Sequence, residues 1–570
     1  MKRHAVNILI GIGLVSFFLF HFIMKNMPGE TALKESLQVD SVSSGILDYG
    51  VMGQLMKKLG LVEFADNDYN RYKKTTGADE DLEIMTFQKK RQVGSYLYKA
   101  NNSRKIGYTS TDIAKKYQAK TDWPVVSIYL DDKNLYDPET GIVANSEKSG
   151  RDWEKLAQVT YMKDGQVEFE GNAGLRIHGG GRLVSKKYQP GFKLYFRKRY
   201  GLEQIPAEMF FPGSEIPIRT LVLQNTAWPP GYPMNNPIAY DIAREIGCVV
   251  PQTRLVEVVL NGKSMGMGFA VEHLSRRQWG QRFGHDNYNF YKFRSDISPE
   301  DEAMYTRKFW TIVTQREDLR VEEVGATIDL DNFSRHVFSW VFSGTTDYCQ
   351  GVAVYDNEDP DAKLSWINWD MDHSFFDLSA YRNNKTRANW QQDAFNIIYR
   401  KSHTCGRTSL FTRLMNESDE FKMFFIELMT EIFNHKLTDS FLEERVAYYE
   451  MMMARFGQPN ETYVQILREY MDNRTNLVLD EAQQFFSLQG PYACSLDNPE
   501  GYDIVIDGYP YNSSYDGRYF KSTPLHLSPA PQIRSQFNHW LVNGEEVYSE
   551  DLDIALEADT TIKLVMKPSS

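Results

Sequence analysis

The hydrophobic periodicity changes along the chain, and these changes restrict the possible folds more than any other feature. From about Gln166 to Glu272, segments such as VEFEGNAGLRIHGG and FKLYFRKRYG alternate apolar and polar residues, which is typical of half-buried strands. Residues 297–345 and 408–487 have helical patterns, and the second block is strongly amphipathic. Residues 490–570 return to short alternating segments separated by Gly, Pro and Asn. The chain is therefore predicted to form an α+β body followed by a small all-β module.

The N-terminus predicts export. Lys2, Arg3 and His4 precede an apolar run from Ala5 to Met24, which is long enough to cross a bilayer as a helix. The run is followed by KNMPGE, which offers no cleavage site of the A-x-A type. We interpret residues 1–25 as a signal anchor with a cytoplasmic N-terminus, so that the bulk of the chain is extracytoplasmic. A cleaved signal peptide is the alternative, and it would export the body as well.

Length and pattern together predict the domain organisation. A chain of 570 residues has room for two or three domains. We expect a tether and an N-terminal helical extension over residues 26–120, a mixed body over 121–488 and a β-sandwich-like accessory domain over 489–570. The net charge of −12 argues against bulk binding to nucleic acid, although a local basic site for phosphate is compatible with it. The four cysteines include no C-x-x-C pair, which argues against a zinc ribbon and leaves one or two disulfides open.

The segment WDMDHSFFD, from Trp369 to Asp377, is the strongest candidate for chemistry. The preceding strand KLSWINWD alternates, so Asp370 and Asp372 share a face if the extended conformation continues. Two such carboxylates can hold Mg²⁺ when substrate phosphates supply the other ligands. An acidic turn or a structural Ca²⁺ site would fit the same residues, but the aromatic surroundings make unpaired carboxylates costly and favour a metal. His373 is expected to orient a carboxylate or to serve as a ligand.

Two further segments are ambiguous when each is taken alone. RIHGGGRLVSKK places three glycines after a strand and basic residues just beyond, which suits a phosphate contact but lacks the spacing of a Walker A or kinase glycine loop. Taken alone, the segment is explained more simply by a β-turn with surface basic residues. Asp347 follows a helix and precedes a strand, where a carboxylate can act as a general base or hold a hydroxyl group. A turn or a cap is the simpler role for a single Asp there.

Seven segments in this order resemble the spore coat protein H (CotH) kinase family over about Trp123 to Phe486: WPVVSIYLDDKNLYDPETGI, GLRIHGGGR, FKLYFRKRYG, VVLNGKSMGMGFAVEHL, NYNFYKFRSD, TTDYCQGVAVY and WINWDMDHSFFD. The resemblance implies an atypical, two-lobed protein-kinase-like fold and ATP-dependent phosphoryl transfer. It implies that Asp347 is the catalytic carboxylate and that Asp370 and Asp372 bind Mg²⁺. It also implies that the phosphate and nucleotide are contacted by Gly180, Arg182, Glu272 and Lys292.

The chain departs from the family pattern at several positions. Pro190 and Gly191 stand where relatives often carry Lys and Ser, so Lys187 or Lys193 would have to supply the charge. Gln350 and Gly351 stand where relatives often show Asn, and an Asp expected near Trp228 to Asn236 is missing. Two functions follow from these observations. One is an exported ATP/Mg²⁺-dependent kinase acting on a cell-envelope or spore-coat protein, and the other is a surface adhesion or assembly protein with an inactive kinase fold.

Overall fold

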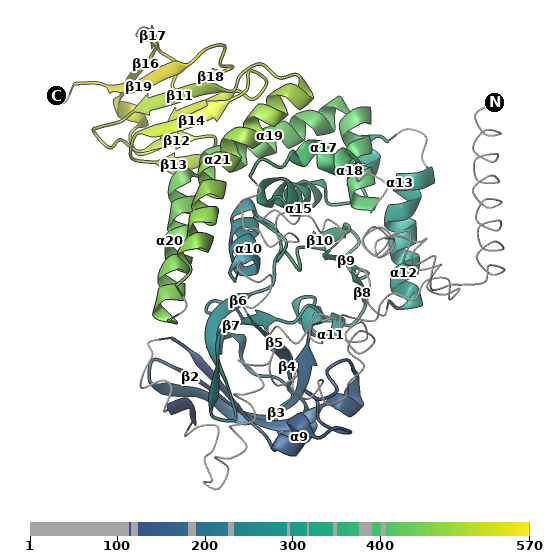
Figure 1. Ribbon diagram of the computed structural model, residues 1–570. Helices are drawn as coiled ribbons and strands as arrows, with labels where there is room; N and C mark the ends of the chain where they lie inside the picture. Colours follow the sequence, from purple (N-terminus) through teal and green to yellow (C-terminus); the bar gives the residue numbers. More distant parts are fainter. Residues whose placement is uncertain are drawn as a thin grey trace, which may run out of the picture. The chain divides into compact units, whose positions relative to one another are not determined.

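The computed structural model describes most of the chain beyond residue 122, as Figure 1 shows in colour. The described ranges are 113–115, 123–179, 190–225, 233–292, 297–315, 319–345, 350–375, 390–400, 406–457 and 459–568. They belong to the unit formed by residues 67–570. The predicted signal anchor and nearly all of the predicted tether lie outside the described residues. None of the helices in the described ranges combines the length and apolarity that a membrane span requires.

The first part of the body is a closed β-barrel. Its strands are β1 (Val125–Tyr129), β2 (Lys155–Lys163), β3 (Gln166–His178), β4 (Gly191–Tyr195), β5 (Thr220–Asn225), β6 (Thr253–Leu260) and β7 (Lys263–Glu272). They run in the order β1-β2-β3-β4-β5-β7-β6, and β1 closes the barrel by pairing in parallel with β6. Alternate side chains such as Ile128, Leu194 and Leu221 fill the interior because the strand period is two. The residues between them in each strand, such as Arg176 in β3 and Lys193 in β4, therefore point to the outer face of the barrel.

The predicted hairpin turn between β6 and β7 is confirmed. Asn261 and Gly262 have φ values of 46° and 80°, the left-handed conformation that a two-residue hairpin loop requires. The Asn261 side chain also fastens this turn to the end of β1. Its Oδ1 accepts from the Leu130 N–H at 3.0 Å and its Nδ2 donates to the Leu130 carbonyl at 2.9 Å.

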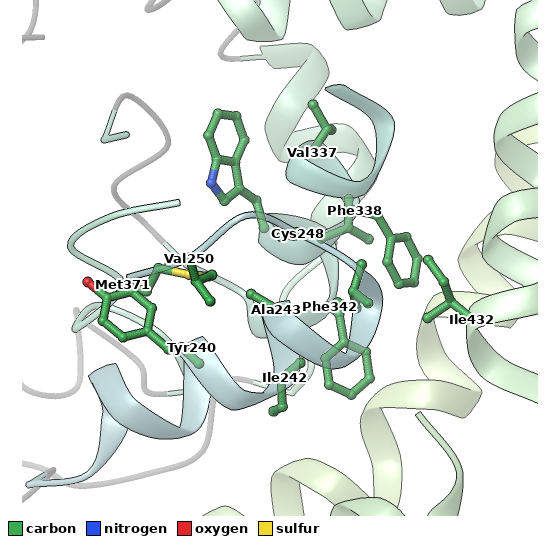
Figure 2. Close-up of a cluster of buried hydrophobic side chains, with 14 of the residues drawn as sticks. Tyr240, Ile242, Ala243, Cys248, Val250, Val337, Phe338, Phe342, Met371 and Ile432 are labelled. Atoms are coloured by element: carbon green, nitrogen blue, oxygen red, sulfur yellow. The ribbon is translucent and has the colours of Figure 1, made fainter. Parts of the chain in front are cut away.

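The second part of the body is mainly helical. Its main elements are α10 (Asn235–Ile246), α12 (Pro299–Tyr305), the π-helical η7 (Thr306–Trp310), α13 (Thr311–Gln315), α14 (Val321–Gly325), α15 (Leu330–Ser343), α17 (Ala394–Arg400), α18 (Gly406–Glu417), α19 (Asp419–His435), α20 (Asp439–Arg455) and α21 (Glu461–Phe486). As predicted, α10 ends at Gly247, whose φ is 98°. Figure 2 shows how Ile242 of α10, Phe338 of α15 and Ile432 of α19 contribute to one buried cluster. This core makes α10 and α15 a rigid support for the loops that they carry.

A three-stranded sheet lies between these helices in the chain. It consists of β8 (Tyr288–Lys292), β9 (Val352–Asp356) and β10 (Ser365–Ile367), in the order β10-β9-β8, and is preceded by the short helix α11 (Arg276–Trp279). An isolated bridge joins Ile367 of β10 to Val249, just after α10. The sheet thereby brings Lys292 and the segment after Ile367 to the end of α10.

The C-terminal residues form two sheets with their own core. One sheet has the order β14-β11-β19-β16-β17 and the other β13-β12-β15-β18. The strands are β11 (Tyr492–Asp497), β12 (Ile504–Ile506), β13 (Tyr509–Tyr511), β14 (Tyr515–Tyr519), β15 (Leu525–Pro529), β16 (Phe537–Val542), β17 (Glu545–Val547), β18 (Leu552–Ile554) and β19 (Thr560–Met566). Trp540 is fully buried between them. The chain is therefore a mixed helix and strand protein with C-terminal sheets.

Polar contacts join these C-terminal sheets to α19. Asn434 Nδ2 donates to the Arg518 carbonyl at 3.0 Å, and the Arg518 N–H donates to Asn434 Oδ1 at 2.9 Å. His435 Nε2 lies 2.9 Å from Asp507 Oδ2, and its ring stacks on Tyr509. Cys494 in β11 and Cys248 after α10 are buried free thiols, whereas the other two cysteines lie outside the described residues.

Candidate functional site

The segment that carries Asp370 and Asp372 leaves the strand before it reaches them. β10 ends at Ile367, and Asp370 has a φ of 60°, so the extended conformation does not continue. The prediction that strand alternation places Asp370 and Asp372 on one face is therefore wrong. A left-handed residue reverses the local chain direction, and Asp is among the non-glycine residues that tolerate this conformation.

Three residues of α10 hold this loop instead. The Asp370 N–H donates to Tyr240 Oη at 3.1 Å, and the Met371 N–H donates to Asn236 Oδ1 at 3.0 Å. Asn235 Nδ2 donates to the carbonyls of Asp372 and Ser374 at 3.3 and 2.5 Å. Met371 lies in the buried cluster with Tyr240 (Figure 2). Sequence reasoning missed these anchors, and the Asn-Asn pair at the start of α10 was the available signal.

Both carboxylates lie near the Tyr240 hydroxyl group. Burial raises the pKa of Tyr240, and the charges of Asp370 and Asp372 raise it further. Asp372 is only 5% exposed, and His373 Nε2 lies 4.0 Å from its Oδ1. The charges of both aspartates therefore act on the Tyr240 hydroxyl group, although the two residues do not alternate along a strand.

Lys292 lies beside the loop of Asp370, and the charge of Lys193 from another sheet acts on it. Burial, together with the charge of Lys193 in β4, lowers the pKa of Lys292 in β8 to about 8, while Asp370 acts in the opposite direction. Lys292 Nζ donates to the Leu274 carbonyl at 3.2 Å and lies 4.7 Å from the centre of a Trp369 ring. Burial and the charge of Arg176 likewise lower the pKa of Lys193 to about 8. The barrel and the three-stranded sheet thus each supply one cation at this place.

Two histidines that sequence reasoning missed share this environment. The pKa values of His178, the last residue of β3, and of His273, just after β7, are held well below the usual value, first by burial and then by Lys193 and Lys292. The Nδ1 atom of each is buried and has no hydrogen-bond partner among the described residues. Unpaired buried polar atoms are costly unless a ligand or water satisfies them. The lysine pair and the two imidazoles therefore form a site suited to an anion.

Glu272, which the resemblance places in the nucleotide site, is already hydrogen-bonded through one of its carboxylate oxygens. Its side chain is almost fully buried, and its Oε2 accepts from the Arg282 guanidinium at 2.6 Å and from the Gln252 N–H at 3.4 Å. Its Oε1 has no partner among the described residues. One carboxylate oxygen therefore fixes the end of β7, and only the other is available to a ligand.

The remaining predicted residues lie outside the described ranges. Gly180, Arg182 and Lys187 belong to the connection between β3 and β4, which begins and ends at the paired residues His178 and Gly191. Asp347 belongs to the connection between α15 and β9. Their roles stay predictions. Of the predicted residues that are described, Lys292 lies beside the loop of Asp370, with its Nζ 4.7 Å from a Trp369 ring, and the charges of Lys193 and Asp370 act on it.

Buried polar side chains support the strand that leads to Asp370. Asn368 Nδ2 donates to Ser339 Oγ at 2.7 Å, and Asn368 Oδ1 lies 2.5 Å from His336 Nδ1. On its other side His336 Nε2 lies 2.9 Å from an Arg407 guanidinium nitrogen, which also donates to the Gln350 carbonyl at 2.7 Å. This network ties Gln350, just before β9, and Asn368, just after β10, to α15 and α18.

Gly351 lies where this network leaves no room for a side chain. It has a φ of 116°, and a Cβ there would lie 2.9 Å from both an Arg407 guanidinium nitrogen and the Ile367 carbonyl oxygen. We expect Gly351→Ala to destabilise the chain by about 2–4 kcal/mol, because steric crowding adds to backbone strain. Chemical unfolding followed by tryptophan fluorescence measures this difference.

Gly201 is the matched control for this prediction. Its φ of 113° is nearly the same, but a Cβ there would meet nothing within 4 Å. Gly201→Ala should therefore show only the backbone strain, about 1–2 kcal/mol. Equal effects of the two substitutions would show that the close contact at Gly351 does not contribute.

The residues present fit a divalent cation of the kind that phosphoryl transfer uses. No group of three or more His, Cys, Asp or Glu side chains suited to a metal occurs within the described ranges. Mg²⁺, however, is commonly held by one or two carboxylates together with substrate phosphates and water. Asp370 and Asp372 meet that requirement if a phosphate ligand binds at the neighbouring lysines.

Comparisons with known proteins agree with the resemblance described above. No curated protein matches the chain. A solved structure, that of the Helicobacter pylori proinflammatory kinase CtkA, is similar at 10% identity, with a TM-score of 0.25, over 52% of this chain and 95% of that one. A family model described as "CotH kinase protein" matches residues 175–484, which is more than half of the 570 residues, so the chain belongs to the CotH kinase family.

Proposed function

We propose that this protein is an ATP- and Mg²⁺-dependent protein kinase with a two-lobed, kinase-like body. The observation that carries the proposal is the position of Lys292, whose Nζ lies 4.7 Å from a ring of Trp369, the residue before Asp370. The charges of Lys193 and Asp370 both act on this lysine, and the buried Nδ1 atoms of His178 and His273, which the same lysines influence, have no partner among the described residues. Phosphoryl transfer requires a cation cluster for the phosphates and a carboxylate for the metal, with little covalent chemistry. Membership of the CotH kinase family supports the same activity.

The roles of the residues follow from their chemistry. Asp370 and Asp372 would hold Mg²⁺, which neutralises phosphate charge when bound. Lys193 and Lys292 would bind phosphate oxygens, and the connection that contains Gly180, Arg182 and Lys187 would approach the same phosphates from β3. Asp347 would accept the hydroxyl proton of the acceptor and orient its oxygen. The α10 anchors and the network around Asn368 would hold the metal-binding loop in place before the substrate arrives.

We further propose that the protein acts outside the cytoplasm on a cell-envelope or spore-coat protein, held to the membrane by residues 1–25. The length of the apolar N-terminal run supports this location. The rival function, an adhesion or assembly protein with an inactive fold, is favoured by Gly351. Gln350 and Gly351 stand where relatives often carry Asn, and the close packing of Gly351 against Arg407 and Ile367 leaves no room for a side chain at that residue.

Transfer from labelled ATP distinguishes these two functions. The full chain, purified in a mild detergent and incubated with labelled ATP and Mg²⁺, should incorporate phosphate into itself or into an envelope protein extract. Asp347→Asn should remove this incorporation while leaving ATP binding within about threefold, because a base acts on the acceptor and not on nucleotide affinity. A wild-type chain that fails to bind ATP would favour the adhesion function, and transfer that survives in Asp347→Asn would refute the assigned carboxylate.

The lysine pair predicts how nucleotide affinity depends on pH. Because burial lowers both pKa values to about 8, the ammonium groups are charged below that pH and become neutral above it. The Kd for ATP should therefore rise between about pH 7 and pH 9, by about tenfold for each lysine that contacts phosphate. Lys193→Arg should remove part of this rise because a guanidinium group stays charged. An unchanged Kd across this range in the wild type would exclude both lysines from the phosphate site.

A further inference from the structure

The outer face of the barrel beside the candidate site carries a dense group of cations. Six basic side chains surround two carboxylates, and we call them the basic face: Arg176, Arg197, Lys198, Arg199, Arg219 and Arg277. They come from β3, from the segment after β4, from the residue before β5 and from α11. This excess of positive charge contrasts with the net charge of −12 of the whole chain.

Glu154 organises one half of the basic face. Its buried carboxylate lies 2.6, 2.9 and 2.5 Å from nitrogens of Arg176, Arg197 and Arg199. Burial alone would raise the pKa of Glu154, but the hydrogen bonds from Arg197 and Arg199 and the charge of Arg176 lower it to about 2. Gly174 gives the side chain room, since a Cβ there would lie 2.6 Å from Glu154 Cγ. One carboxylate thus fixes three guanidinium groups and neutralises only one of them.

Glu203 organises the other half in the same way. Its carboxylate oxygens lie 3.4 Å from Lys198 Nζ, and 3.4 and 3.1 Å from guanidinium nitrogens of Arg219 and Arg277. The two halves adjoin, because the consecutive residues Arg197, Lys198 and Arg199 pair in turn with Glu154, Glu203 and Glu154. The Nε atoms of Arg176 and Arg219 are buried and have no partner among the described residues. The basic face therefore has uncompensated charge and unused donors.

The basic face leads directly to the candidate phosphate site. Arg176 pairs in register with Lys193 across β3 and β4, so both side chains project from the same outer face. The charge of Arg176 also depresses the pKa of Lys193. A chain bound along the basic face would therefore end beside the group that is proposed to hold the nucleotide phosphates.

We propose that the basic face binds an acidic segment of the protein substrate, next to the hydroxyl group that accepts phosphate. The cations are spread over several elements and do not converge on one point, which suits an extended segment with several carboxylates better than a single phosphate. Long polyanions such as nucleic acid would also meet the acidic remainder of the protein, which disfavours them. That the bound segment belongs to a substrate rests on the proposed kinase function, but the binding test does not require catalysis.

Peptide binding to the full chain tests the proposal. The probe is a fluorescently labelled peptide of glutamates around one serine, and the reference is the same peptide with glutamine in place of glutamate. At about 0.15 M ionic strength, where charges are screened over about 8 Å, the glutamate peptide should bind at least tenfold more tightly. Arg199→Glu combined with Arg277→Glu should abolish most of this preference, with at least about a tenfold rise in Kd. Lys198→Glu, at a side chain 86% exposed, should raise Kd without disturbing packing.

The matched control is Arg534→Glu in the C-terminal sheets. Its side chain is 41% exposed, as is that of Arg277, and it also pairs with a carboxylate, that of Asp551. It should leave the Kd of the peptide within about twofold, because its charge lies outside the basic face. Equal binding of the two peptides, equal losses in the control and basic-face variants, or tighter binding of a DNA oligonucleotide or of phosphatidylserine vesicles would overturn the proposal. Loss of ATP binding with peptide binding retained would refute the kinase function and leave the acidic-segment surface intact.

Discussion

Asp370→Asn should reduce phosphoryl transfer by about 10²–10³-fold or more, the loss expected when a metal that stabilises phosphate charge is no longer held. Asparagine keeps the shape of the side chain and tolerates the left-handed backbone at φ 60°, so the loop should remain in place. The Asp370 N–H would still donate to Tyr240 Oη. Removing only the charge therefore separates metal binding from loop structure, which an alanine substitution at this left-handed position would not do.

Steady-state transfer measured over a range of Mg²⁺ concentrations checks this expectation. The variant should need more Mg²⁺ for its residual activity, because one of two carboxylate ligands has lost its charge. Asp359→Asn is the control, since Asp359 is an exposed carboxylate in the turn between β9 and β10. It should retain transfer within about twofold, as surface substitutions usually do. Comparable losses in both variants would argue against a metal at Asp370.

The architecture of the described body was largely predictable, because long periodic segments report their own secondary structure. The α10 helix with its Gly247 stop, the Asn261-Gly262 turn and the helices from residue 408 onward follow directly from local pattern. Strand β2 was missed, although Lys155 to Lys163 pairs with both β1 and β3. Residues 159–162 of this strand are all buried, so the sequence there lacks the apolar and polar alternation that identifies a half-exposed strand. The closure of the barrel by β1 and β6 depends on contacts that no local pattern contains.

The sequence proposed residues for the candidate site, whose roles stay predictions, but it could not give their geometry. Asp370, Lys193 and Lys292 were selected from motifs, and the charges of Lys193 and Asp370 act on Lys292 because a barrel strand, a β8 strand and a loop held by α10 converge. The prediction that the two aspartates share one face was wrong as a strand argument. Asp370 has a left-handed backbone, and this interrupts the alternation of side chains that an extended strand would give. His178 and His273 were missed because an isolated histidine beside a glycine or a strand end gives no signal until its neighbours in space are known.

Arg474→Met should destabilise the protein by about 2–5 kcal/mol, because it removes four hydrogen bonds to backbone carbonyls, among them the one to the buried Val341 carbonyl. Arg474 of α21 is fully buried and donates to the carbonyls of Val341 and Phe342 at the end of α15. It also donates to the carbonyls of Trp390 and Gln392, at 2.7 and 2.5 Å. A cation at a helix C-terminus is further favoured by the helix dipole. Methionine fills similar space but supplies none of these hydrogen bonds.

Arg468→Met on the same helix separates this effect from a general loss of charge. Arg468 is 34% exposed and pairs with Glu450 at 2.6 Å, a surface ion pair that contributes about 0–1 kcal/mol. Urea unfolding followed by tryptophan fluorescence should therefore show a large shift of the midpoint only for Arg474→Met. Hydrogen exchange should locate that loss at the last turn of α15, where the chain enters the segment that contains Asp347. Equal midpoints for the two variants would show that other donors or water satisfy the α15 carbonyls, and Arg474 would then have no special part in holding that segment.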